Sequence, residues 1–300
     1  MKVLIIGLGS IAKKHIKALK EIDVRVTVYA LRSSKKSGTY EDVINVYSIQ
    51  DIESLNIDFC IISSPTALHH QHINQLTSFT FPLFIEKPLS HTLKISELEQ
   101  CLDSKKTYVA CNLRFLDALE YVKQEILPTN TEKIQEVEAY CGSYLPEWRQ
   151  GVDYKKNYSA IPELGGGVHL DLIHEVDYIY WLFGKPIHQV KTLKSQSALN
   201  IESIDYASYQ FSYEGFETHV TLNYYRPLPK RTLEIVFETY IIKVDLLTNT
   251  VYKNDKEIYK SNQLPIETYR KQLEYFINTT PTFNTFKEAL VVLNMCLNEE

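Results

Sequence analysis

Residues 165–184, with the sequence GGGVHLDLIHEVDYIYWLFG, begin with three glycines and contain two histidines, three carboxylates and an apolar run that ends at a fourth glycine. Asp171 and His174 lie three residues apart, so on a helix they would share one face. A carboxylate beside an imidazole can bind, hold and move a proton. His169 precedes Asp171 by two residues and would face another side, which favours a packing role. The residues alone leave three interpretations open: a metal site, a proton-transfer pair, or a helix whose polar face carries histidines.

A second group of histidines, His69, His70 and His72, has a spacing that metal ligands can use. No cysteine or carboxylate in this stretch completes a ligand set. We therefore expect no metal in the protein.

Lys87 is another candidate for a catalytic or binding role. In FIEKPLS, residues 84–90, Lys87 follows an apolar strand-like run and precedes Pro88, which favours an extended backbone at Lys87. At the carboxyl edge of a parallel sheet such a side chain faces the ligand crevice. Its ammonium group can donate a hydrogen bond to a substrate oxygen.

The N-terminal stretch VLIIGLGSIAKKH carries a G-x-G-x-x-A pattern between a predicted strand and a predicted helix. Gly7 permits a tight turn, Gly9 lets a pyrophosphate approach the backbone, and Ala12 allows close packing of helix and strand. The N–H groups at the start of the helix can bind phosphate. The context on both sides predicts a dinucleotide loop.

The residues at the end of the second predicted strand indicate which dinucleotide is bound. NAD is usually bound there by an acidic residue, but this chain has Arg32, Ser33, Ser34 and Lys35 instead. Cationic and hydroxyl side chains suit a 2′-phosphate, which a carboxylate would repel. We therefore expect NADP, with NAD as the alternative.

Two domains are expected for 300 residues. Up to about residue 115, apolar strands (2–7, 25–31, 56–64, 82–88 and 107–113) alternate with helices such as 10–22 and 91–105, which predicts an N-terminal Rossmann domain with a parallel sheet. Residues 116–300 predict an α+β domain with a large, mostly antiparallel open sheet from strands at 134–144, 205–213, 218–226, 232–240 and 240–248. The helical segment 266–299 is compatible with packing on either domain.

Composition indicates a soluble globular protein. The net charge is −5, the lysines are scattered, and no apolar stretch reaches transmembrane length, so neither nucleic acid nor a membrane is an expected partner. The five cysteines form no C-x-x-C pair, which favours free thiols and a cytoplasmic location.

The motifs GLGSIA, SSPTALHHQH, EKPLS, CNLRF and the 165–184 segment occur in an order that resembles the Gfo/Idh/MocA oxidoreductase family, which includes glucose–fructose oxidoreductase and inositol dehydrogenase. The likeness extends over most of the chain. It implies hydride transfer between NAD(P) and a carbon that bears a sugar or cyclitol hydroxyl. It also implies a homo-oligomer, a dimer or a tetramer, formed through the open sheet.

The resemblance assigns roles to individual residues. Lys87 contacts both substrate and nicotinamide, His174 is the acid/base, and Asp171 is its partner or a substrate ligand. The residues expected to bind the cofactor are Gly7, Gly9, Ser10, Ile11, Ala12, Arg32, Ser33, Ser34, Ser64, Pro65, His69, Glu86, Lys87, Asn112 and Arg114. For Arg114 a structural role that bridges the domains is an equal alternative.

The chain departs from the family's usual Asp-x-Gly-x-His pattern, because Asp171 and His174 are three residues apart with no glycine between them. A sub-branch of the family, found among enzymes of bacterial surface-sugar biosynthesis, has the same shorter spacing. The loop SYLPEWRQGVDYKKNYSA is similar to that sub-branch. Its side chains suit a sugar, with aromatic faces for C–H surfaces and a guanidinium for an anionic group. The residues expected to bind substrate are Lys87, Tyr144, Trp148, Arg149, Tyr154, Asp171 and His174.

These observations favour an NAD(P)-dependent dehydrogenase or reductase that acts on a CH–OH group of a sugar, sugar nucleotide or related carbohydrate. One alternative is elimination or glycoside cleavage in which the cofactor is oxidised and reduced within one cycle. Another is a dinucleotide sensor without catalysis, although a sensor would not need Lys87 and His174. The sequence leaves open which of these two residues accepts the proton.

Overall fold

The computed structural model describes residues 1–35, 38–102 and 105–297 and divides the chain into two compact units. The first unit comprises Met1–Asn112 and Leu264–Leu293, and the second comprises Leu113–Gln263 and Asn294–Glu300. Most of the C-terminal helical segment, whose packing the sequence leaves open, therefore belongs to the first unit.

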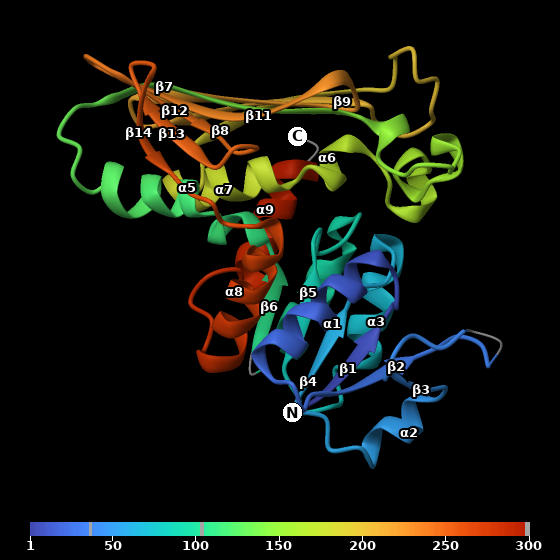
Figure 1. Cartoon of the computed structure of the whole chain (residues 1–300). Coiled ribbons are helices and arrows are strands. Elements are labelled where there is room, and N and C mark those ends of the chain that lie inside the picture. The colour runs from blue at the N-terminus through green and yellow to red at the C-terminus, as the bar shows by residue number, and fades with distance from the viewer. Residues whose placement is uncertain (36–37, 103–104, 298–300) are drawn as a thin grey trace. The chain divides into compact units, whose positions relative to one another are not determined.

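The first unit contains a sheet of six parallel strands in the order β3-β2-β1-β4-β5-β6 (Figure 1). These strands are β1 (Lys2–Ile6), β2 (Thr27–Leu31), β3 (Ile44–Val46), β4 (Phe59–Ile62), β5 (Leu83–Glu86) and β6 (Thr107–Ala110). Every residue of β4, β5 and β6 is buried, as expected for parallel strands covered on both faces. The strand order reverses between β1 and β4, and such a reversal opens a ligand crevice at the carboxyl ends.

The helices of the first unit are α1 (Ser10–Ile22), α2 (Ile49–Glu53), α3 (His69–Gln75), α4 (Glu99–Leu102), α8 (Pro265–Asn278) and most of α9 (Phe286–Leu297). α1 packs against α8. The predicted helix 91–105 is less regular than expected, because its first part, Leu93–Leu98, is a 3₁₀ helix.

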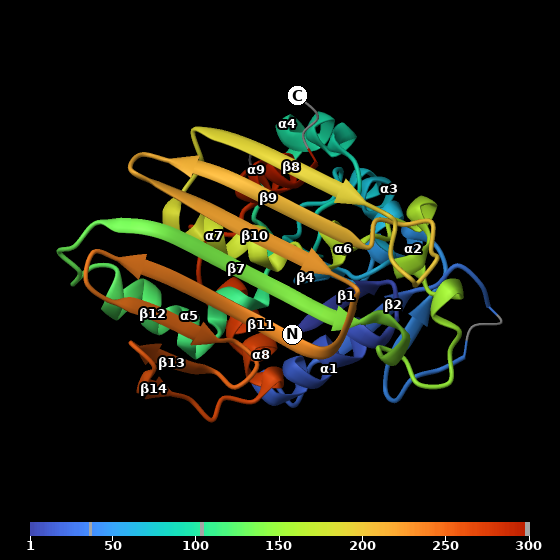
Figure 2. The same ribbon diagram turned by 90° about the horizontal axis from the view of Figure 1, so that it is seen from above.

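The second unit contains a sheet of eight strands in the order β14-β13-β12-β11-β7-β10-β9-β8, and only the β7–β10 pair is parallel among the described pairings (Figure 2). Its strands are β7 (Ile134–Tyr144), β8 (His188–Lys194), β9 (Tyr206–Tyr213), β10 (Phe216–Asn223), β11 (Tyr225–Phe237), β12 (Ile241–Asp245), β13 (Thr250–Lys253) and β14 (Lys256–Lys260). Together the two sheets confirm the predicted fold class.

One face of this sheet is covered and the other is open. On β7, Val137 and Ala139 are buried, whereas Glu136 and Glu138 on the other face are exposed. The helices α5 (Asp117–Tyr121), α6 (Val168–Asp171) and α7 (His174–Phe183) lie along the buried face, as both ribbon views show (Figures 1 and 2). No described helix of the second unit lies on the exposed face.

Two predictions for the second unit were wrong in detail. Residues 218–226 and 232–240 correspond to two separate strands, β10 and β11, as expected. However, β11 begins at Tyr225 instead of residue 232 and runs to Phe237, with a register shift between Tyr225 and Lys230. Pro227 and Pro229 lie at this irregularity and cannot donate to the ladder. The predicted single helix across 165–184 is two helices, because α6 ends at Asp171 and α7 begins at His174.

Candidate active site

The turn between β1 and α1 has the geometry of a dinucleotide loop. Gly7 has a φ of +94°, and a Cβ atom on it would lie 2.3 Å from the backbone nitrogen of Ser64, so only glycine fits there. Gly9 is the N-cap of α1, and a Cβ atom on it would meet nothing within 4 Å. Ala12 is fully buried, which lets α1 lie close to the sheet. The open side of the loop thus offers the first N–H groups of α1 to a phosphate.

A cavity of about 420 Å³ adjoins this loop within the first unit. The predicted cofactor residues that line it are Gly7, Arg32, Ser33, Ser64 and Pro65. Further lining residues that the sequence did not single out include Tyr47, Leu68, His72 and Gln75. The described lining contains no Asp or Glu. The glycine turn and the Arg32 guanidinium in the lining therefore fit a dinucleotide.

The segment that carries Lys87 begins at the end of β5. Glu86 is buried, and its Oε1 atom lies 2.5 Å from Nε2 of the buried His15 on α1. The backbone N–H of Lys87 donates to the other carboxylate oxygen of Glu86 at 3.2 Å. The Lys87 side chain itself is only half-buried.

His69 and His72 have different surroundings in the structure. His69, predicted to bind the cofactor, is buried, with ring nitrogens 3.0 Å from the carbonyl oxygens of Pro88 and Ser64. Burial lowers the pKa of His69. His72 lines the cavity, and its Nδ1 atom is 2.8 Å from the Ser64 hydroxyl. Of these two histidines, only His72 is among the described lining residues of the cavity.

The two residues taken from CNLRF also have protein partners. The Asn112 amide donates to the Thr268 hydroxyl at 2.8 Å, within the first unit. Arg114 is almost fully buried and donates to both carboxylate oxygens of Asp177, at 2.8 and 3.0 Å, within the second unit. This bidentate pair favours a structural role for Arg114 over cofactor binding. The pair lies inside the second unit, whereas the expected structural role was to bridge the two domains.

In the second unit, the carboxylate of Asp171 is held by two tyrosines. The Tyr158 hydroxyl donates to Oδ1 at 2.8 Å, and the Tyr224 hydroxyl donates to Oδ2 at 2.5 Å. Asp171 and Tyr224 are buried. Burial, with the charge of Asp171, raises the pKa of both tyrosines, so they remain protonated donors at neutral pH.

The loop that follows β7 lies around this carboxylate. The Trp148 ring meets the Tyr224 ring edge to face, with centroids 5.2 Å apart, and the Arg149 guanidinium lies 5.6 Å from the Tyr158 ring centre. The Tyr154 hydroxyl instead donates to the Leu199 carbonyl, which ties down the loop. Of the predicted substrate residues, Trp148 and Arg149 therefore contact the tyrosines that hold Asp171. Tyr144 is the last residue of β7.

His174 begins α7 and is buried. The next residue, Glu175, accepts two hydrogen bonds from Arg231 of β11, at 2.6 and 3.1 Å. Because Glu175 is fully buried, this ion pair anchors the start of α7 to the sheet. The helix start that carries His174 therefore has a defined position.

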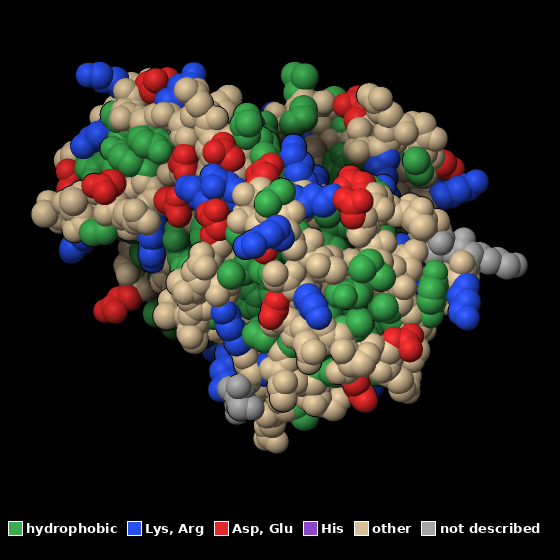
Figure 3. Space-filling view, turned by 60° about the horizontal axis from the view of Figure 1, so that its bottom comes forward, with side chains coloured by type: hydrophobic (Ala, Val, Ile, Leu, Met, Phe, Trp, Pro, Cys, Tyr) green, Lys and Arg blue, Asp and Glu red, His purple; other side chains and the backbone are tan. Residues whose placement is uncertain are grey.

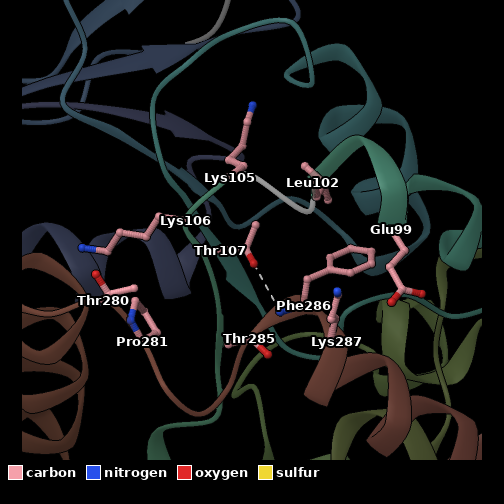
Figure 4. A pocket seen from close by; sticks show the side chains of 10 residues that line it. All are labelled: Glu99, Leu102, Lys105, Lys106, Thr107, Thr280, Pro281, Thr285, Phe286 and Lys287. Atoms are coloured by element: carbon pink, nitrogen blue, oxygen red, sulfur yellow. Dashed lines mark hydrogen bonds between the residues drawn. The ribbon is translucent and has the colours of Figure 1, made fainter.

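A second cavity of about 220 Å³ in the first unit has a different character (Figure 4). It is lined by Lys105, Lys106 and Lys287, and the close-up shows the Lys105 and Lys106 side chains pointing in different directions. The Lys105 ammonium is bound by backbone carbonyls of residues 76, 77 and 79. These cations do not converge on one position, as an anion site would require.

Two further classes of site find no support in the described part of the chain. No group of three or more His, Cys, Asp or Glu side chains there could hold a metal ion. None of the helices described is both long and apolar enough to cross a membrane.

The family follows from comparison with known sequences. The model of the oxidoreductase family Gfo/Idh/MocA, NAD-binding Rossmann fold, matches residues 1–113, and the model of the Gfo/Idh/MocA C-terminal domain matches residues 130–243. No curated protein matches the chain in sequence. The chain belongs to the Gfo/Idh/MocA oxidoreductase family, and it is an NAD(P)-binding oxidoreductase.

Solved structures share this fold at low identity. Levoglucosan dehydrogenase in complex with NADH and levoglucosan has a TM-score of 0.84 at 15% identity, over 98% of this chain and 95% of that chain. Myo-inositol 2-dehydrogenase from Lactobacillus plantarum has a TM-score of 0.78 at 18% identity, over 99% and 95%. UDP-N-acetylglucosamine 3-dehydrogenase from Acidithiobacillus ferrooxidans has a TM-score of 0.76 at 16% identity, over 99% and 95%.

Proposed function

We propose that this oxidoreductase transfers a hydride between NADP(H) and a hydroxyl-bearing or keto carbon of a sugar, sugar nucleotide or related carbohydrate. The observation that carries the proposal is the Asp171 carboxylate, held by two tyrosine hydroxyls beside Trp148 and Arg149. Carboxylates accept sugar hydroxyls, and aromatic faces pack on sugar C–H surfaces. The dehydrogenases for levoglucosan, inositol and UDP-N-acetylglucosamine that share the fold support this substrate class.

The proposed roles follow from the chemistry of each side chain. The bound nicotinamide supplies the hydride acceptor or donor. Lys87 donates a hydrogen bond to the reacting oxygen, and His174 takes the hydroxyl proton or returns it in the reverse direction. Asp171 orients His174 or the substrate. Acid–base assistance of this kind contributes about 10²–10⁴-fold to the rate.

NADP is the proposed cofactor because Arg32 and Ser33 line the cavity without a carboxylate in its described lining. We expect NADPH to bind more tightly than NADH in a fluorescence titration. Arg32→Ala should reduce NADPH affinity by about 10–100-fold, the value of a charge-assisted hydrogen bond, and change NADH affinity little. Arg25→Ala, at an exposed arginine outside the described cavity lining, is the matched control. Tighter binding of NADH by the wild type would overturn the choice of NADP.

The activity itself is tested by a panel of sugars, cyclitols and sugar nucleotides with NADP⁺, in which NADPH formation is followed by absorbance. Oxidation of at least one compound, lost in Lys87→Ala and His174→Ala while cofactor binding is retained, is the expected result. Product formation without net NADPH would favour elimination or glycoside cleavage. Cofactor binding without any turnover across the panel would favour a sensor.

A small-molecule partner also suits the surface of the protein. On the face shown in Figure 3, Lys and Arg side chains are interspersed with Asp and Glu. This mixture lacks the continuous basic stripe that nucleic-acid binding uses. The five cysteines are all free, which suits the reducing cytoplasm as the proposed location.

The partner that we propose for the open face of the eight-stranded sheet is a second copy of the chain. Four of its outward side chains, Glu136, Glu138, Gln210 and His219, are polar and exposed. A broad, regular surface of this kind suits a symmetric, polar interface, which gives a dimer or, by repetition, a tetramer. Light scattering in solution should give two or four times the chain mass, and a monomer at micromolar concentration would contradict the proposal.

A further inference from the structure

The strand end that carries Lys87 is connected to α1 through a buried histidine. His15 is fully buried, and its Nε2 atom lies 2.5 Å from Oε1 of Glu86. Oε2 of the same carboxylate accepts the backbone N–H of Lys87 at 3.2 Å. One carboxylate therefore joins the helix that starts at the dinucleotide loop to the peptide unit of Lys87.

The His15 ring has a single, well-defined orientation. It packs edge to face against Phe84 of β5 at 5.1 Å and against Tyr269 of α8 at 5.5 Å between ring centroids. Nδ1 of His15 is buried without a hydrogen-bond partner among the described residues. The tautomer with its proton on Nε2 donates to Glu86 and leaves no N–H unsatisfied, so it is the favoured form.

The carboxylate depends on this contact. Glu86 is only 7% exposed, and without His15 its Oε1 atom would lose its described donor, leaving only the Lys87 N–H on Oε2, which is unfavourable for a buried carboxylate. The segment after Lys87 is held separately, because the buried His69 lies 3.0 Å from the Pro88 carbonyl and 3.0 Å from the Ser64 carbonyl. Lys87 thus lies between Glu86 and Pro88, both of which contact buried histidines. The contact on the Glu86 side is the one that depends on His15.

We infer that His15 is a positioning residue for Lys87, because its hydrogen bond to Glu86 sets the place of the Lys87 backbone relative to α1. This inference rests on the proposed function, in which Lys87 contacts the reacting oxygen. A displacement of about 1 Å at a reacting group can cost about 100-fold in rate, although the mutated residue never touches substrate.

The chain offers a matched control. His70 on α3 and Glu97 form a second histidine–glutamate pair, with a 2.6 Å contact, at the surface of the same unit. Their side chains are 25% and 51% exposed, and neither residue has a place in the proposed catalytic or cofactor-binding set. His70→Leu removes the same kind of contact without touching Lys87.

The experiment compares His15→Leu, His15→Asn, His15→Gln and His70→Leu. The longer amide of glutamine can donate to Glu86 from about the position of Nε2, whereas the amide of asparagine is too short. We expect kcat to fall about 10–100-fold in the Leu and Asn variants, to recover largely in the Gln variant, and to stay at the wild-type value in His70→Leu. NADPH affinity should remain close to wild type throughout. If the Leu variant does not fold, the Asn and Gln pair carries the comparison.

A folded His15→Leu or His15→Asn variant with wild-type kcat would overturn the inference. A parallel loss of kcat and NADPH affinity would also overturn it, because His15 would then support the dinucleotide loop instead.

A second measurement does not need turnover, so it remains informative if no sugar is oxidised. With NADP⁺ bound, the rate at which an amine-reactive reagent acylates Lys87 is measured by mass spectrometry. Lys13 serves as an internal reference. We expect a severalfold change in the Leu and Asn variants and restoration in the Gln variant. An unchanged Lys87 rate would refute the positioning role, whereas a changed rate without sugar turnover would leave it standing and refute the proposed reaction.

Discussion

Asp171 owes its position to two tyrosines that no sequence motif connects with it. Tyr158 lies in the loop after β7, and Tyr224 directly follows β10, yet both hydroxyls donate to the one carboxylate. Because each oxygen of Asp171 accepts a hydrogen bond, its orientation is fixed before substrate arrives. Both tyrosines belong with Asp171 in any account of the site.

The first prediction concerns this network. Tyr224→Phe should lower kcat about 10–100-fold, because Asp171 loses one of the donors that orient it. It should also destabilise the protein by about 1–3 kcal/mol, the cost of an unsatisfied buried acceptor. Sugar kinetics and urea unfolding measure the two effects.

Tyr213→Phe is the control for this prediction, since the Tyr213 hydroxyl donates to the Gly184 carbonyl in the same unit and does not contact Asp171. An equal loss of kcat in the two variants would show that Tyr224 acts only through general stability.

At the scale of elements, the turn between β1 and α1 contains one glycine that the fold requires and one that the fold alone does not require. Gly7 is required by its positive φ and by the backbone of Ser64, whereas the Gly9 position has room for a side chain in the protein alone. The two glycines of this motif therefore occur for different physical reasons, Gly7 for folding and Gly9 for binding.

This difference gives the second prediction. Gly7→Ala should destabilise the protein by at least about 1–3 kcal/mol, because a Cβ atom forces the neighbouring backbone to move. Gly9→Ala should fold with a stability within about 0.5 kcal/mol of wild type, but it should bind NADPH weakly because the methyl group takes the place of the approaching pyrophosphate. Urea unfolding and NADPH titration measure the two properties. Wild-type NADPH affinity in Gly9→Ala would contradict the proposed cofactor position.

The helices around His174 show why a sequence pattern can give the right residues with the wrong local geometry. Three-residue spacing favours one helical face, but α6 and α7 meet between Asp171 and His174. The Arg231–Glu175 and Arg114–Asp177 pairs fix the first turn of α7 from outside the helix. Long-range ion pairs of this kind leave no periodic signal in the sequence.

At the scale of the whole molecule, the stability of the second unit should depend on pH. Burial lowers the pKa of His169 to about 4, below the value near 6.5 of an unfolded histidine. Between these values the unfolded chain binds more protons than the folded chain. His169 therefore does not lower the free energy of unfolding above about pH 6.5, but it lowers it progressively as the pH falls towards 4.

The corresponding loss at pH 5 is about 2 kcal/mol of unfolding free energy relative to pH 7. Because both tryptophans, Trp148 and Trp181, lie in the second unit, their fluorescence reports on unfolding of that unit. His169→Gln should show a smaller pH dependence than the wild type, and His188→Gln, at an exposed histidine, should not. Equal pH dependence in His169→Gln and wild type would contradict the assignment to His169.

The fold class could be read from the sequence because its signals are repeated along the chain. Apolar strands of β4, β5 and β6 and the alternating β7 leave strong periodic patterns. The strands that the sequence did not indicate are β3, β8, β13 and β14. Three of these have only three to five residues, and β8 alternates between half-buried and exposed positions without a fully buried residue.

The sequence by itself determined the features that depend on a few adjacent residues: the glycine turn before α1, the cations after β2, and a lysine at the end of β5. Tertiary structure decided which distant side chains complete the site. Tyr158 and Tyr224 reach Asp171 across 13 and 53 positions of the chain, and His15 reaches Glu86 across 71. Turns and strand ends are set by local sterics and hydrogen bonds, whereas these contacts arise only when buried polar groups must find partners in the folded core.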